Sequence, residues 1–287
     1  MTVKSNIKKI LQIFYKPLLL SFRKEDRAFA SFMTLCGIWA LFPFAIFAES
    51  LANFVHMQKY LNQAMAYVFG LFPAFVSSSI AKDFNTVLSQ PHSSILTLSF
   101  LATAYFSSNG VEAVRGALDY VYGIEEKRSF ITCRLQSLAF ILLGTASLIV
   151  ISFFLVFIPL AIKFYHSFTP SFFSFLAEAK VWRYIFAAPI AVISLVIVHK
   201  WLPAGKRSVR EVFPGVIATV LLWLTSSMGF EFYLTNFSDY RSTYAGLASL
   251  MANLIFFHLI NSIFLFGAEL NVSYKKYKQK ENTLPHQ

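Results

Sequence analysis

The chain alternates between long apolar stretches and short segments that collect its charges. Three stretches carry no charged residue, namely Leu135–Ile162, Val212–Phe230 and Ser242–Ala268. An α-helix needs about 20 apolar residues to cross the hydrocarbon core of a bilayer, and each stretch has about that length or more. The pattern therefore predicts three membrane-spanning helices.

Three further apolar segments fit the same interpretation, with Trp182 and Trp201 as interfacial anchors of one of them. The pattern thus predicts an all-α membrane bundle of six transmembrane helices, at about 28–53, 92–112, 135–162, 182–201, 212–234 and 243–269. Composition agrees, because 56% of the residues are hydrophobic, only 14% are charged and the mean hydropathy is +0.58. A soluble domain of this composition would expose a very large apolar surface.

The Lys and Arg residues predict the orientation. With six spans, 19 of the 25 fall on one side, whereas counting Leu61–Ala81 as a seventh span divides them 12 against 13. Since cytoplasmic loops collect Lys and Arg, we expect six spans with both termini cytoplasmic. The segment 57–91, interrupted by Gly70 and Pro73, is then a re-entrant or surface-lying helical pair on the outer side.

The two ends of the chain are basic. Residues 1–27 carry seven Lys and Arg between apolar residues at helical spacing, which predicts an amphipathic helix on the inner leaflet. Residues 273–287 form a basic tail that we expect to be disordered. The net charge of +11 follows from topology, so the expected partners are membrane lipids, with no nucleic acid. A homo-oligomer is compatible with the sequence, and its motifs predict no cofactor, metal site or catalytic residue.

Polar residues within or beside the spans are the candidates for a substrate path, because such residues usually face a bundle interior or a water-filled cavity. We expect Glu231, Asp239 and Arg241 at an outer mouth and His258 with Asn261 at mid-membrane. An inner gate would consist of Glu269 and Asn271. The remaining candidates are Glu49, Asn109, Glu112, Arg115, Asn236, Tyr240, Tyr244 and Asn253.

The same residues allow a structural interpretation. Carboxylates near span ends reach interfacial water, and asparagines often join helices within a membrane. Glu112 and Arg115 are three residues apart on one helix face and would neutralise each other. The sequence leaves open whether these groups line a pathway or fasten helices.

Four groups of residues form motifs along the chain, namely Tyr120–Phe130 followed by Arg134, Val212–Gly215, Tyr233–Phe237 with Tyr240 and Tyr244, and Phe266–Asn271. In this order they resemble the YihY/BrkB family of bacterial inner-membrane proteins. The resemblance implies a place in the bacterial inner membrane and six spans with both termini inside. Members have been called ribonuclease BN, virulence factor and transporter, so it implies no single activity.

Three functions follow as hypotheses. The first is a transporter or flippase-like exporter of an amphiphilic or anionic molecule through a polar-lined bundle, in which titration of His258 would couple protons to movement. The second is a non-transporting scaffold or a lipid-binding envelope or virulence factor. A membrane-bound hydrolase or ribonuclease comes last, because phosphodiester cleavage needs a metal site or a positioned acid–base pair on the cytoplasmic side.

Overall fold

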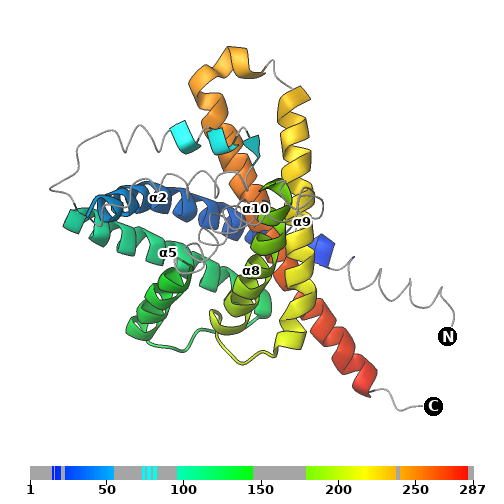
Figure 1. The fold of residues 1–287 in the computed structure, drawn as a ribbon. Coiled ribbons are helices and arrows are strands. Elements are labelled where there is room, and N and C mark those ends of the chain that lie inside the picture. Colours follow the sequence, from blue (N-terminus) through cyan, green and yellow to red (C-terminus); the bar gives the residue numbers. More distant parts are fainter. Residues whose placement is uncertain are drawn as a thin grey trace, which may run out of the picture.

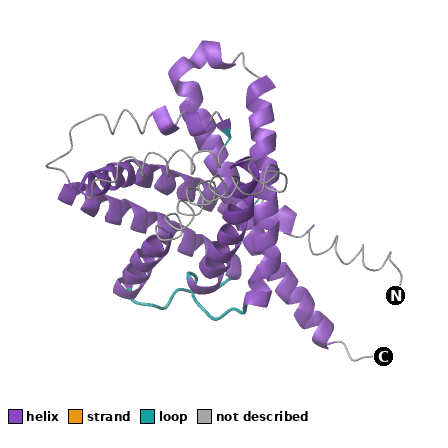
Figure 2. Ribbon diagram, in the orientation of Figure 1, coloured by secondary structure: helices purple, strands orange, loops and turns teal. Residues whose placement is uncertain are grey.

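The computed structural model describes residues 15, 17–20, 23–54, 73–74, 76–78, 80–82, 96–144, 179–236 and 240–283. The labelled helices are α2 (Lys24–Phe54), α5 (Leu96–Tyr122), α8 (Ala179–Trp201), α9 (Val209–Asn236) and α10 (Tyr240–Thr283), and a further helix covers Phe130–Gly144. The described residues contain helices and loops without a strand (Figure 2). The predicted all-α class is confirmed, whereas the count of six spans stays a prediction.

Helices α2 and α5 lie side by side and cross the α9–α10 pair instead of running parallel to it (Figure 1). Helix α10 contacts α2, α5 and α9, while α8 packs against α9. Two described helical segments, Val209–Asn236 and Leu250–Lys280, are long and apolar enough to cross a membrane. Phe130–Gly144 and Ala188–Trp201 are shorter apolar helices.

The main core lies where α2, α5, α8, α9 and α10 pack together. Its buried members include Met33 of α2, Leu118 of α5, Leu195 of α8, Val216 of α9 and Leu265 of α10. A second cluster joins Val76 to Phe230 of α9 and Phe256 of α10. The described residues of the 73–82 segment, which are mostly helical, therefore pack against these two helices.

Two loops lie together at one end of the molecule (Figure 2). Helix α5 ends at Gly123, whose φ of 65° suits a residue without a Cβ; its N–H binds Tyr120 O at 3.0 Å, and Ile124 N binds Asp119 O at 2.9 Å. In the loop 202–208, Gly205 also has a positive φ, of 84°. A Cβ there would lie 3.1 Å from the Ile124 side chain, so this glycine permits the close approach of the two loops.

Two helices run further than the sequence predicts. Helix α5 passes the expected end of a span at 112 and continues to Tyr122. Helix α10 continues to Thr283, so the disordered tail expected from residue 273 is wrong over 273–283. An ion pair of 3.1 Å between Lys275 and Glu211 ties this extension to α9. The 1–27 prediction lies mostly outside the described residues, but α2 already begins at Lys24.

Candidate functional site

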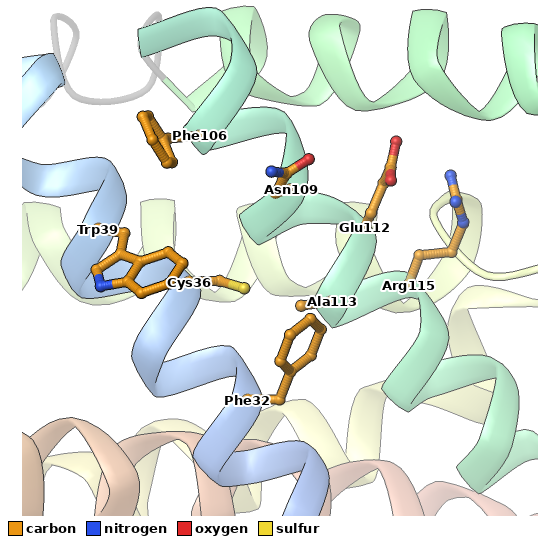
Figure 3. Close-up of a pocket in the computed structure, with 8 residues that line it drawn as sticks. All are labelled: Phe32, Cys36, Trp39, Phe106, Asn109, Glu112, Ala113 and Arg115. Atoms are coloured by element: carbon orange, nitrogen blue, oxygen red, sulfur yellow. The ribbon is translucent and has the colours of Figure 1, made fainter. Parts of the chain in front are cut away.

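A pocket of about 370 Å³ lies between α2 and α5 (Figure 3). Phe32, Cys36 and Trp39 line it from α2, at the spacing that places side chains on one helix face. From α5 it is lined by Phe106, Asn109, Glu112, Ala113 and Arg115. Aromatic rings thus form one part of the wall, and an amide and two charged groups form the other.

The carboxylate of Glu112 is held by Arg134, which lies on the Phe130–Gly144 helix. Nη1 of Arg134 donates to Glu112 Oε1 and to Asn109 Oδ1, each at 2.9 Å. The guanidinium also lies over the Tyr105 ring, 5.3 Å from its centroid. The prediction that Glu112 and Arg115 neutralise each other is wrong, because a tertiary contact supplies Glu112 with a different cation.

Arg115 is directed to the neighbouring loop. Its Nε lies 3.6 Å from Oε2 of Glu126, which is beyond hydrogen-bond distance. Glu126 already accepts from Arg128, at 2.9 Å from the backbone N, at 2.8 Å from Nε and in a further bond from Nη2. These bonds hold the pKa of Glu126 well below its usual value, at about 2. Arg128, two residues further along the chain, therefore supplies the cation that neutralises this carboxylate.

Arg128 also fastens the loop 202–208 and the neighbouring helix. Its Nη2 donates to Leu202 O at 3.1 Å and its Nη1 to Gln136 Oε1 at 2.6 Å. Gln136 in turn donates to Trp201 O at 2.6 Å. The polar end of the pocket is therefore continuous with a network that joins α5, α8 and the Phe130–Gly144 helix.

A second polar cluster, here called the junction, is buried where α5, α8, α9 and α10 meet. The Tyr122 hydroxyl lies 3.0 Å from Nδ1 of His199 and accepts from Asn271 Nδ2 at 3.4 Å. Asn271 Oδ1 accepts the Gly215 N–H at 2.7 Å, and the Arg207 guanidinium lies 4.0 Å from the centroid of the Tyr122 ring. One tyrosine and one asparagine thereby connect four helices and the 202–208 loop.

The junction depends on a close crossing of α9 and α10. A Cβ on Gly215 would overlap the carbonyl oxygen of Gly267, and one on Gly267 would overlap Oγ1 of Thr219. Small residues four apart let two helix backbones approach, as is common in membrane proteins. Asn271 reaches the α9 backbone only because Gly215 has no side chain.

The two polar residues expected at mid-membrane contact α2. Asn261 Nδ2 donates to Thr34 Oγ1 at 3.0 Å, and Nδ1 of His258 lies 3.4 Å from Ser31 Oγ. Asn261 is therefore bonded to a neighbouring helix. These contacts join α10 to α2. Helix α2 also lines the pocket.

The structure brings some of the predicted residues together and leaves others apart. Asn109, Glu112 and Arg115 share the pocket, while Glu269 and Asn271 are buried in α10. Glu231 and Asn236 are exposed on α9, with Asn236 bonded to Phe232 O of its own helix, and Asn253 is half-buried on α10. Glu49 is in α2, and Tyr240, Arg241 and Tyr244 are in α10, but their side chains lie outside the described residues, as does Asp239.

Sequence reasoning missed the remaining members of the junction. Asp119 is buried and accepts the Ala204 N–H at 2.7 Å, and His199 is fully buried. Tyr122 and Gly123 belong to a segment that carries the family resemblance, but the resemblance assigned them no role. A glycine that ends a helix one residue after a tyrosine was the available signal.

Long apolar helices with buried polar contacts between them are typical of a helical membrane protein, and comparison with known sequences supports this class. Residues 21–287 match the family described as virulence factor BrkB. The chain belongs to this family, which confirms the resemblance seen in the sequence.

Individual relatives agree. The chain is 25% identical to the ribonuclease-like protein YfkH of Bacillus subtilis over 86% of this chain and 89% of that protein. It is 26% identical to a UPF0761 membrane protein of Aeromonas salmonicida over 31% of each chain. Another UPF0761 membrane protein, of Alteromonas mediterranea, is 30% identical over 29% of this chain and 28% of its own. No solved structure matches.

Proposed function

We propose that this membrane protein transports an amphiphilic molecule, which binds in the pocket between α2 and α5. The observation that carries the proposal is the division of the pocket wall. Phe32, Trp39 and Phe106 offer apolar surface, whereas Asn109, Glu112 and Arg115 offer hydrogen bonds and charge. A ligand that fills such a pocket needs an apolar part and a polar part.

The pocket is also open toward the surroundings of the protein. Phe32 is 52% exposed and Trp39 is 56% exposed. In a membrane, these rings would contact lipid, so an amphiphile could enter sideways without first leaving the bilayer. This access supports transport of a molecule that is already dissolved in the membrane.

The carboxylates beside the pocket are poor candidates for a hydrolase. A general base works best when its pKa lies near the operating pH. The pKa of Glu126 is instead lowered to about 2 by Arg128, and Glu112 is bound by Arg134. These ion pairs keep both carboxylates charged and make them poor groups for proton transfer. One relative nevertheless carries a ribonuclease-like name.

A non-transporting scaffold is the second candidate, and the contacts of α10 favour it. Asn261 bonds to Thr34, and His258 lies beside Ser31, which is how polar residues fasten helices. In that case the polar groups of α10 contribute to stability alone, and the protein acts by holding lipids or partners.

Reconstitution of the full chain into liposomes separates the two candidates. Phospholipids carrying a fluorescent head-group label are mixed into the bilayer, and dithionite then bleaches the labels that reach the outer leaflet. A transporter increases the bleached fraction beyond the outer-leaflet share. We expect Trp39→Ala to reduce this movement at least several-fold, because it removes most of one aromatic wall of the pocket.

Trp201→Ala is the matched control, since Trp201 has the same exposed fraction of 56% and lies outside the pocket. It should leave the movement of labelled lipid unchanged. If the wild type moves none of the labelled lipids, or if the two variants behave alike, transport through this pocket is wrong and the scaffold is favoured.

A further inference from the structure

The charges at the polar end of the pocket do not balance. Three guanidinium groups gather there, from Arg115, Arg128 and Arg134. They face two carboxylates, those of Glu112 and Glu126. Further along α5, the buried carboxylate of Asp119 faces Arg115 and Arg128 as well as Arg207. Among the charged groups that meet at the pocket end itself, the guanidinium groups outnumber the carboxylates by one.

Arg115 is the group that carries this surplus. Glu112 is bonded to Arg134, and Glu126 is bonded through both oxygens to Arg128. Nη1 of Arg115 is buried and has no hydrogen-bond partner among the described residues. A buried donor without an acceptor is costly, so an acceptor supplied by a ligand would be favourable.

The position of Arg115 relative to the aromatic wall indicates the shape of this ligand. Figure 3 shows Phe32, Trp39 and Phe106 along the pocket, with the Arg115 guanidinium beyond Ala113 and Glu112. The carboxylate of Glu112 is paired with Arg134, which offsets its negative charge. An anionic group at Arg115 would leave an attached hydrocarbon chain against the aromatic rings. A small free anion would satisfy the arginine and leave the rings without a function.

We propose that the pocket binds an anionic amphiphile, with its negative head group at Arg115 and its hydrocarbon chain along the aromatic wall. The inference rests on the proposed function for its site and adds the charge of the substrate. On the topology predicted from the positive charges, Arg115 lies near the cytoplasmic interface. The head group would then come from the inner leaflet, where anionic phospholipids are available.

The test measures which lipid lies against Trp39. The full chain is reconstituted in phosphatidylcholine bilayers that contain a small fraction of phosphatidylglycerol with brominated chains, because bromine quenches tryptophan fluorescence on contact. The Trp39→Phe variant is measured alongside the wild type. The difference in tryptophan quenching between the two is the contribution of Trp39 in the pocket. Brominated phosphatidylcholine at the same mole fraction gives the quenching of Trp39 that is expected if the pocket does not select the anionic lipid.

We expect brominated phosphatidylglycerol to quench Trp39 about 5-fold more effectively than its mole fraction predicts, since one cation near a membrane surface favours an anionic lipid by that order. Arg115→Gln should remove the excess, and Arg115→Lys should retain most of it. Arg210→Gln is the matched control, because Arg210 is exposed on α9 and outside the pocket, and it should leave the excess unchanged.

Three results would overturn the inference. These are equal quenching by both brominated lipids, an excess that survives Arg115→Gln, and an excess that inorganic phosphate at millimolar concentration abolishes. The last result would indicate a site for a free anion. Circular dichroism and gel filtration of each variant confirm that it is folded, and Arg115→Lys still tests the charge if Arg115→Gln does not fold.

Binding and transport fail separately. Selective quenching without movement of labelled lipid would retain the anionic site and favour the scaffold over the transporter. Movement of labelled lipid without selective quenching would retain the transporter and show that its substrate is not chosen by charge.

Discussion

The junction and the pocket use similar residues for different ends. In the junction, the Tyr122 hydroxyl contacts both His199 and Asn271 beside the crossing of α9 and α10. In the pocket, Arg115 lacks an acceptor for one of its nitrogens within the described part of the chain, and Trp39 is more exposed than buried. His199 Nε2 and Arg207 Nη1 of the junction are also buried without a hydrogen-bond partner among the described residues, so the pocket differs by the cavity of about 370 Å³ that Arg115 lines.

The difference shows that an adjacent cavity separates binding from fastening better than residue type does. Both regions contain an arginine beside an aromatic ring, with Arg207 over Tyr122 and Arg134 over Tyr105. Arg134 bonds to Asn109 and Glu112, which line the pocket, whereas Arg207 belongs to the junction. Substitutions in the junction should therefore lower stability, whereas substitutions in the pocket should alter binding.

The largest expected effect is at the helix crossing. Gly215→Ala places a methyl group against the carbonyl of Gly267, and we expect it to lower the free energy of unfolding by about 3 kcal/mol. Gly229→Ala in the same helix is the control, because a Cβ there has no atom within 4 Å. Thermal unfolding in detergent compares the two, and equal midpoints would show that α9 and α10 do not cross closely.

A smaller effect should depend on pH at Glu126. Its pKa is depressed in the folded protein, so its ion pair stabilises the fold above the unfolded pKa of about 4.5 and this stability is lost as the pH falls toward about 2. Glu126→Gln should cost roughly 1 kcal/mol at neutral pH, since the pair is partly exposed to solvent. The difference from wild type should shrink below pH 4.5.

Thermal unfolding between pH 7 and the lowest pH at which the wild type stays folded measures this difference. Glu125→Gln is the neighbouring control, because the Glu125 side chain is exposed. A Glu126→Gln effect that stays constant as the pH falls would mean that the carboxylate is not held by Arg128.

The smallest expected effect concerns the hydrogen bond between Asn261 of α10 and Thr34 of α2. This bond fastens two helices, as the junction does, but one of these helices also lines the pocket. A double-mutant cycle of Asn261→Leu and Thr34→Val should give a coupling of about 0.6 kcal/mol, the usual size for a hydrogen bond between membrane helices. A cycle with Thr225→Val, whose hydroxyl bonds to its own helix, is the control. Coupling near zero together with a loss of lipid movement would assign Asn261 to the path.

Much of the fold could be predicted because helix formation in apolar stretches depends on local pattern. The ends of helices were harder to predict. The sequence placed the end of a membrane span near Glu112 because charges begin there, and α5 continues from there to Tyr122. Arg134 and the Ala204 N–H provide partners for Glu112 and Asp119 in this part of the helix. In the same way Glu211 of α9 pairs with Lys275, and α10 continues past this residue to Thr283.

The candidate site was predicted only in part. Asn109, Glu112 and Arg115 were selected for their polarity beside an apolar stretch, and they do lie together in the pocket. Their aromatic neighbours from α2 could not be selected, because phenylalanine and tryptophan are common in membrane helices. His258 and Asn261 were expected to line a path, and the structure places them beside Ser31 and Thr34.

The sequence by itself determined the helical class, the family and the polar residues worth attention, since spacing, length and motif are properties of the chain alone. Tertiary structure decided which acid meets which base. Glu112 pairs with a cation 22 residues away instead of one three residues away. Tyr122 meets His199 of α8 and Asn271 of α10, and Asn271 in turn accepts from the Gly215 N–H of α9. Hydrogen bonds and ion pairs act over a few ångströms, so their partners follow from helix packing and not from distance along the chain.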